Sequence, residues 1–237
     1  MISFFRKIRQ KLLSQNRITR YLVYALGEIA LVMIGILLAL QVNNWNETKK
    51  NRAFEKEILG LIDQNLMKDS ILITAELSDA RMGNTLTDSL LKQINLRNYD
   101  ERLNDWMGKI ITFQRFKSQS SAFEVLKSKG IDNISNKELQ LVLMEYYDQT
   151  LFKVYQANED VQHFFEYDWV PVAKAQFSSF IYLEKIEPRN PEEFFDDPST
   201  PVLFKMYQDN RSGSIRRMEK ALEDISTLRV LIKQQSL

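Results

Sequence analysis

The chain has 237 residues and a formal net charge of +1, which gives no overall attraction to nucleic acid. It contains no cysteine, so disulfides, thiolate metal sites and a cysteine nucleophile are excluded. Seven glycines and five prolines are few for this length, and such sparse punctuation allows long uninterrupted helices.

The first twenty residues are basic. The lysines and arginines that precede the first acid are Arg6, Lys7, Arg9, Lys11, Arg17 and Arg20. Apolar residues such as Ile2, Phe5 and Ile8 recur between them at helical spacing, which is typical of a helix lying on an anionic inner leaflet. A disordered basic tail that only sets topology is the alternative interpretation. Either way, we expect residues 1–20 to be a basic cytoplasmic segment.

An apolar run follows over residues 21–42. As a helix it would be about 33 Å long, close to the hydrocarbon thickness of a bilayer. Tyr21 and Tyr24 at one end and Trp45 at the other are ring side chains that favour the headgroup layers. The run is too long for a signal-peptide core and lacks a small-residue cleavage pattern, so the sequence predicts an uncleaved transmembrane anchor.

The charges around the run predict its orientation. Six lysines and arginines precede it, whereas the four that follow closely are Lys49, Lys50, Arg52 and Lys56. The side richer in these residues faces the cytoplasm. We therefore expect a cytoplasmic N-terminus and a large C-terminal part outside the cytoplasm.

Glu28 is a carboxylate inside the apolar run, where an acid at the bilayer centre costs roughly 2.5–3.5 kcal/mol. Three interpretations are open. Glu28 snorkels toward Arg17 or Arg20, it lies in a helix–helix contact, or it carries protons in a motor-like assembly. It shares a helix face with Gly35 and Ala39, whose small-xxx-small spacing lets helix backbones approach. This face favours lateral assembly.

Residues 43–237 are predicted to form an all-α bundle domain. Apolar residues at four-residue steps from Phe54 to Leu66 continue the helix directly from the membrane span. This helix is expected to reach about Ile94, with Gly83 as its weak point.

Further helices are predicted along the rest of the domain. One is closed at Gly130, and a capping box over Ser135–Glu138 opens a long helix that Pro171 bends or ends. A last helix covers the apolar positions from Ile215 to Leu228. Residues 183–201 hold four of the five prolines and are predicted to be one long loop. No alternating strand pattern of useful length is present.

No catalytic signature emerges. His163 is the only histidine, and with Asp160 and Glu166 it gives half of a di-metal motif whose second half is missing. No phosphate-binding loop, dinucleotide fingerprint or nucleophile elbow occurs. We therefore expect no enzymatic activity, no metal site and no cofactor.

The stretch from Gly27 to Glu47, GEIALVMIGILLALQVNNWNE, resembles the N-terminal signature of an uncharacterised family of single-pass membrane proteins from Gram-negative bacteria. Residues 120–149, SSAFEVLKSKGIDNISNKELQLVLMEYYDQ, resemble a second block of that family. The resemblance implies a bacterial inner-membrane protein with a periplasmic C-terminal domain. It also implies that Glu28 belongs to the defining motif. It implies no activity, because the family has none assigned.

Two functions remain open at this stage. The first is a membrane-anchored structural or interaction module that assembles with itself or with another membrane protein through Glu28, Gly35 and Ala39. The second is a sensor-like bundle that binds a ligand and signals to a separate membrane partner.

Overall fold

The structure is a computed structural model that describes residues 18–235. It is 83% helical, with one two-stranded sheet in the part of the chain it describes. The all-α prediction, an N-terminal apolar helix followed by a helical region, is confirmed. The chain divides into two compact units, Met1–Phe54 and Glu55–Leu237, which are described separately below.

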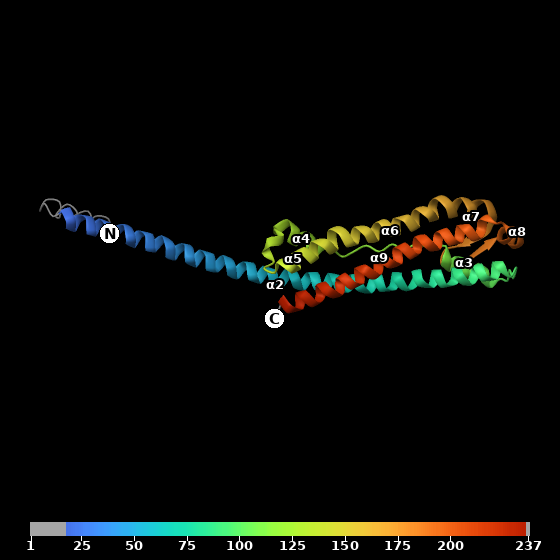
Figure 1. The fold of residues 1–237 in the computed structure, drawn as a ribbon, viewed down its shortest axis with the longest axis horizontal. Helices are drawn as coiled ribbons and strands as arrows, with labels where there is room; N and C mark the ends of the chain where they lie inside the picture. The colour runs from blue at the N-terminus through green and yellow to red at the C-terminus, as the bar shows by residue number, and fades with distance from the viewer. Residues whose placement is uncertain (1–17, 236–237) are drawn as a thin grey trace. The chain divides into compact units, whose positions relative to one another are not determined.

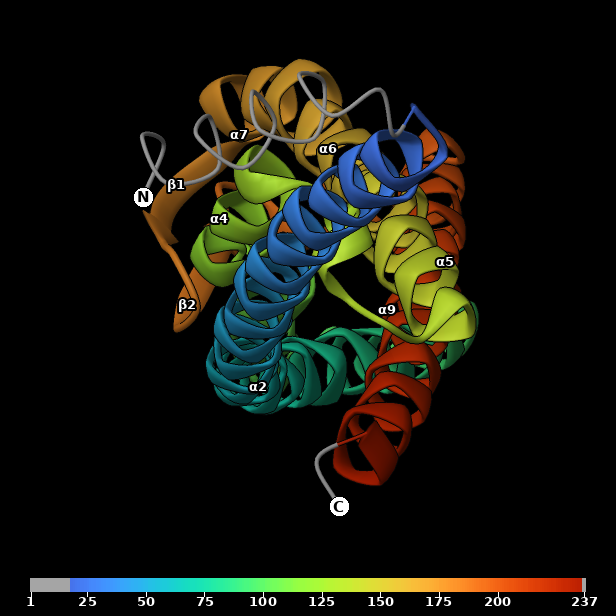
Figure 2. The same ribbon diagram turned by 90° about the vertical axis from the view of Figure 1, so that its left-hand side faces the viewer.

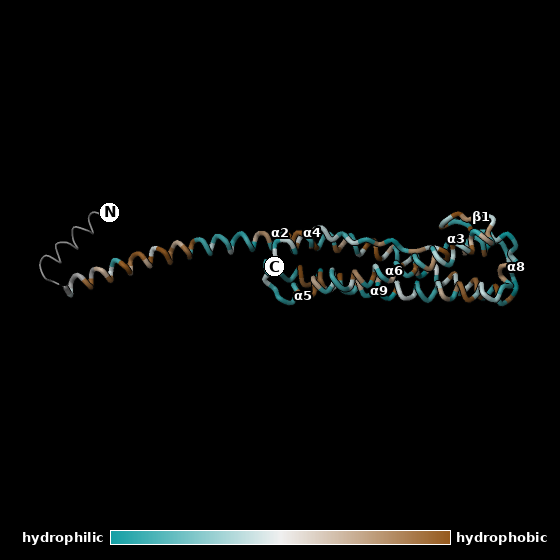
Figure 3. Tube along the Cα trace, turned by 90° about the horizontal axis from the view of Figure 1, so that it is seen from above, coloured by the Kyte–Doolittle hydropathy of each residue, from teal (hydrophilic) through white to brown (hydrophobic). Residues whose placement is uncertain are grey.

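Helix α2 runs from Ile18 to Asn95. Figure 3 shows its early part as a nearly continuous hydrophobic stretch, followed by a hydrophilic one. Within the second unit, hydrophobic and hydrophilic positions alternate along the helix. Buried residues there include Ile62, Leu66 and Ile73, none of which is exposed. The predicted end of the helix near Ile94 agrees with the structure.

In the second unit, the later part of α2 lies beside two other long helical segments (Figure 1). These are α6, Leu151–Phe164, and the last helix α9, Ser199–Gln235. Viewed end-on in Figure 2, α6, α9 and this part of α2 lie on different sides of the bundle. The arrangement buries one face of each helix, as the predicted apolar spacing requires.

The segment that contains α6 is one long helical stretch with two π-helical turns. It consists of α5 (Lys137–Glu145), the π turn η2 (Tyr146–Thr150), α6, the π turn η3 (Phe165–Trp169) and α7 (Val170–Gln176). Pro171 lies in the first turn of α7, directly after the π turn η3. The chain therefore continues as a helix through Pro171 to Gln176.

The predicted capping box at Ser135 is wrong. Asn136 is the N-cap of α5, and its side chain accepts a hydrogen bond from the Leu139 N–H. Ser135 instead donates its N–H and its hydroxyl to the Glu55 carboxylate, at 2.7 and 2.9 Å. Glu55 also accepts a hydrogen bond from Gln235 at 3.2 Å, so it joins α2 to the end of α9.

Between α2 and α5 lie two short helices and an extended segment. The helices are α3 (Arg102–Ile110) and α4 (Ser121–Lys129), and the 3-10 turn η1 (Ile131–Asn133) follows. Gly130 ends α4 with a positive φ of 105°, as its residue type suggested. Residues 111–120 have no regular structure, and we call them the strap.

The predicted long loop over residues 183–201 is also wrong. Strands β1 (Phe177–Ile181) and β2 (Lys185–Pro188) form an antiparallel hairpin, and α8 covers Pro191–Asp196. The prolines stand where each element tolerates them: Pro188 ends β2, Pro191 begins α8 and Pro201 lies in the first turn of α9. The number of prolines alone therefore does not predict a loop here.

The hairpin packs against α3 and closes one end of the bundle. A Cβ on Gly108 of α3 would collide with the backbone of Glu184, so only glycine permits this approach. The core beneath it joins residues from many elements, including Met107, Trp169 and Phe204. Trp169 and Phe204 lie with ring centroids 4.8 Å apart.

Candidate functional site

The apolar segment of α2 is the first candidate. From Leu22 to Val42, every large apolar side chain whose surroundings are described is more than half exposed. Among the described residues, this is the one helix long and apolar enough to cross a membrane. No large apolar side chain of this segment is buried by the described part of the chain, which is the expected state of a helix that another medium or another protein covers.

The predicted assembly residues Glu28, Gly35 and Ala39 all lie on this segment. At 3.6 residues per turn, their spacing of seven and four places them within about 40° of one another around the helix. A Cβ placed on Gly35 would have no neighbouring atom within 4 Å, so nothing in the described part of the chain occupies that space. The three residues share a face, and its role in assembly stays a prediction.

The other predicted membrane residues are placed only in part. Trp45 lies on α2 with 69% of its surface exposed. Arg20, Tyr21 and Tyr24 also belong to α2. The remaining basic residues lie outside the described residues: Arg6, Lys7, Arg9, Lys11 and Arg17.

The strap is the second candidate, because its buried backbone is held by side chains from other elements. The Phe113 N–H donates to the Tyr182 hydroxyl at 3.4 Å, and the Ser118 N–H donates to the Tyr155 hydroxyl at 3.1 Å. An extended segment among helices has no neighbouring strand to pair with. Side-chain oxygens take over that role here.

Asp69 of α2 also accepts hydrogen bonds from the strap, and it has no exposed surface. Its carboxylate accepts hydrogen bonds from the Ser118 hydroxyl and, at 2.8 Å, from the Gln119 N–H. Burial raises the pKa of Asp69, and the two hydrogen bonds oppose that rise only in part. The pKa of Glu76 is also raised, chiefly by burial, although the Arg115 backbone N–H donates to it.

Two buried tyrosines lie near Asp69, on the π turn η2. Tyr147 stacks on Phe123 with ring centroids 4.1 Å apart, and Tyr146 meets Tyr147 edge-on at 4.9 Å. Neither hydroxyl has a hydrogen-bond partner in the described structure. Burial, reinforced by the Asp69 charge, raises the pKa of both phenols. Phenols with raised pKa values stay protonated near neutral pH, so they are poor general bases.

Arg211 of α9 is the one fully buried cation among residues 18–235. It donates to the Ile110 carbonyl at the C-terminal end of α3, where the helix dipole favours a cation. Its guanidinium lies 4.7 Å from the centre of the Tyr207 ring, whose hydroxyl donates to the Thr112 carbonyl at 2.6 Å. Arg211 and Tyr207 therefore hold the start of the strap.

Gly83 makes room for Arg211. A Cβ at this position would lie 2.8 Å from the Arg211 Nη1 atom. Helix α2 continues unbroken through Gly83 to Asn95, and a side chain from α9 fills the space beside this glycine. Sequence reasoning missed Asp69 and Arg211, since neither lies in a motif and each fits a solvated helix position equally well.

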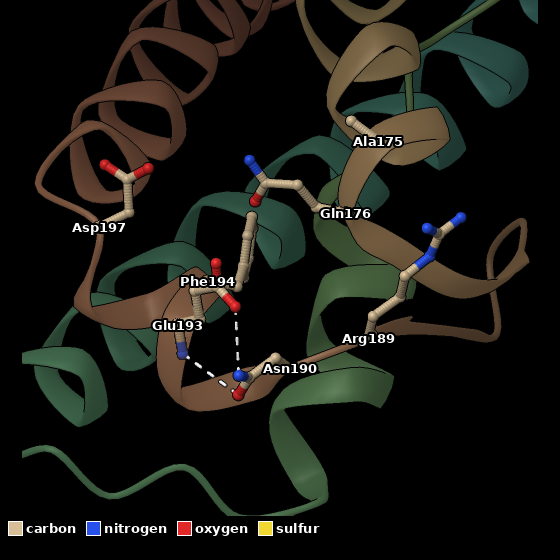
Figure 4. A pocket seen from close by; sticks show the side chains of 7 residues that line it. All are labelled: Ala175, Gln176, Arg189, Asn190, Glu193, Phe194 and Asp197. Atoms are coloured by element: carbon tan, nitrogen blue, oxygen red, sulfur yellow. Dashed lines mark hydrogen bonds between the residues drawn. The ribbon is translucent and has the colours of Figure 1, made fainter.

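A surface hollow of about 220 Å³ lies between α7, α8 and the start of α9. Figure 4 shows Asn190 facing Glu193 in it, with Asp197 on the far side. Asn190 accepts from the Glu193 N–H at 3.4 Å, and Asp197 accepts from the Ser199 N–H at 2.8 Å. Asn190 and Asp197 therefore serve as helix caps, and Gln176 and Arg189 also line the hollow.

The half di-metal motif is not assembled. His163 is exposed and lies 3.8 Å from Glu159, its nearest ionic neighbour among the described residues. Within residues 18–235, no group of three histidine, aspartate or glutamate side chains has the geometry to hold a metal ion.

These features define an all-helical protein with one helix able to span a membrane. The chain belongs to the Family of unknown function (DUF6090), which it matches over residues 28–182. The match includes Glu28, the strap and both π turns. No curated protein and no solved structure matches the chain.

Proposed function

We propose that this protein is a membrane-anchored interaction module without enzymatic activity. Residues 21–42 span the inner membrane of a bacterium, with the N-terminus in the cytoplasm and the second unit in the periplasm. The observation that carries the proposal is the apolar segment of α2, whose large side chains are exposed all around the helix. Exposure of that extent in water is unfavourable, at about 25 cal/mol per Å² of apolar surface.

Lateral assembly through Glu28, Gly35 and Ala39 is the second part of the proposal. A carboxylate in hydrocarbon is stabilised when a neighbouring helix supplies polar partners. The open space beside Gly35 gives such a helix room to approach. The ligand-sensing alternative has less support, because two polar residues of the hollow near α8, Asn190 and Asp197, serve as helix caps.

In-cell crosslinking with mass spectrometry tests the assembly. Full-length wild type is compared with Glu28→Gln and with the control Glu47→Gln, which removes a carboxylate beyond the predicted span. We expect a specific crosslinked species, either the chain itself or another membrane protein, in wild type and in the control. Glu28→Gln should lose it. Identical crosslinks in all three proteins would contradict the assembly role of Glu28.

A further inference from the structure

One side of α2 within the second unit carries an exposed row of uncharged residues. They follow one another at steps of three or four, and they are Met67, Ile71, Ala75, Ser78, Met82 and Thr85. The large apolar members Met67, Ile71 and Met82 are 43%, 63% and 49% exposed. We call this row the α2 stripe.

The spacing of the stripe is that of a helix–helix seam. Residues that alternate three and four apart line up along one side of a helix and pack between those of a neighbouring helix. The bundle already uses the opposite side of α2, where Leu66, Ile73 and Leu77 are buried. The stripe is therefore a second packing face, which no other element covers among the described residues.

Charged residues flank the stripe on both sides. At about 100° per residue, Lys68 and Asp79 lie on one flank, and Asp63 and Arg81 lie on the other. When two copies of α2 lie side by side in parallel, each flank meets the opposite flank of its neighbour. Lys68 then lies near Asp63 of the second copy, and Asp79 lies near Arg81. Both pairs have opposite charges, the arrangement that favours pairing.

Two of these groups already have ionic partners in their own chain. Asp63 binds Arg229 at 2.7 Å, and Arg81 binds Glu219 at 2.6 Å. The Arg81 side chain is still 60% exposed. Pairing with a second copy would extend these ion pairs into networks across the interface.

We infer that the α2 stripe binds the α2 stripe of a second copy of this chain, with the two helices parallel. Charge alone fits either direction, so the parallel direction rests on the proposed membrane anchor, which inserts both copies by their N-terminal segments. The inference deepens the proposed function, because it names a second copy as the partner.

The absence of native cysteine makes disulfide trapping a direct test. The full-length chain in its membrane carries one new cysteine, Ile71→Cys or Ser78→Cys on the stripe, or Ser128→Cys as an exposed control on α4. Under mild oxidation we expect disulfide dimers from both stripe positions and none from Ser128→Cys. Equal dimer yields at all three positions, or no dimer at the stripe positions, would overturn the inference.

The direction of pairing is tested at the two ends of the stripe. In a parallel pair, Met67→Cys and Thr85→Cys each form a disulfide with the same residue of the second copy. An antiparallel pair would form one only when a Met67→Cys chain meets a Thr85→Cys chain, and that outcome overturns the inference. A charge reversal on the flank, Lys68→Glu, should remove the Ser78→Cys dimer while the helical circular dichroism stays unchanged.

The inference about the α2 stripe and the proposal about Glu28, Gly35 and Ala39 can be contradicted independently of each other. If Glu28-dependent crosslinks persist and stripe disulfides are absent, the stripe inference is wrong and the membrane assembly stands. If the stripe disulfides form and the crosslinks of Glu28→Gln equal those of wild type, the stripe inference stands and the role of Glu28 is wrong.

Discussion

The early and late segments of α2 belong to one helix, yet their apolar side chains are distributed differently. Over residues 22–42 these side chains point in all directions and are exposed, whereas Ile58, Ile62 and Leu66 lie on one face and are at most 3% exposed. An apolar surface all around a helix suits a bilayer, and an apolar stripe suits a protein core. The width of the apolar surface, more than its hydrophobicity, separates the two segments.

Each segment also contains a carboxylate among apolar neighbours. Asp69 in the late segment is buried against the strap, which donates two hydrogen bonds to it. Glu28 in the early segment lies in the predicted span, where we propose that a neighbouring helix plays a similar part. Substitutions at three kinds of residue test this comparison between the two segments.

Leucine truncation should give the largest difference. Leu66→Ala removes a side chain with no exposed surface and should lower the free energy of unfolding by about 2–5 kcal/mol. Leu37→Ala, in the exposed early segment, should leave it unchanged. Chemical denaturation of the full-length protein in detergent, followed by circular dichroism, measures both. Equal losses would mean that the early segment packs against its own chain.

Asp69→Ala should give the second largest effect. The variant leaves the Gln119 N–H and the Ser118 hydroxyl without their acceptor, at a cost of roughly 1–3 kcal/mol for each donor that stays buried. Asp69→Asn keeps an amide of the same shape in contact with both groups, so it should retain most of the stability. A loss as large in Asp69→Asn would show that the charge, and not the hydrogen bonding, holds the strap.

Wild type and Asp69→Asn should also differ in how their stability depends on pH. Because burial raises the pKa of Asp69, the folded protein binds this proton more tightly than the unfolded chain does. Its contribution to stability is complete below the ordinary value of 3.8 and is lost as the pH rises through the folded pKa. Lowering the pH from neutral toward that ordinary value should therefore stabilise wild type relative to Asp69→Asn.

Glycine substitution should give the smallest effect. Gly83→Ala places a methyl group against the buried Arg211 guanidinium and should cost about 1–3 kcal/mol, reduced by the gain of roughly 1 kcal/mol from replacing a helical glycine. Gly35→Ala meets no atom of its own chain, so the unfolding free energy of the second unit should not change. Thermal unfolding of both variants provides the comparison. A stabilised Gly83→Ala would mean that Arg211 moves aside without cost.

Much of the fold could be predicted because it is periodic. The end of α2 near Ile94 and the helical class follow from apolar spacing, which reports local structure directly. The hairpin and α8 could not be predicted in this way. The strands of the hairpin are short, and β1 buries only Phe177 among its five residues. The prolines of residues 183–201 also give this segment a composition that is typical of a loop.

The candidate site residues likewise divide into one that a local sequence pattern indicates and two that it does not. Glu28 could be identified as a candidate from the sequence, because a carboxylate is rare in an apolar run. Asp69 and Arg211 lie in ordinary helical sequence. Asp69 binds Ser118, 49 residues away, and Arg211 binds Ile110, 101 residues away. Such contacts are long-range, so no local pattern of one sequence records them.

The contacts of Glu55 also bear on the order of folding. This residue begins the second unit, yet its carboxylate binds Ser135 and Gln235, which lie 80 and 180 positions later in the chain. Closing such long loops costs entropy that only the finished bundle offsets. During synthesis, Gln235 can reach Glu55 only after the residues between them have been made, because the two lie 180 positions apart. We therefore expect the contacts that join the two ends of the second unit to form late in folding.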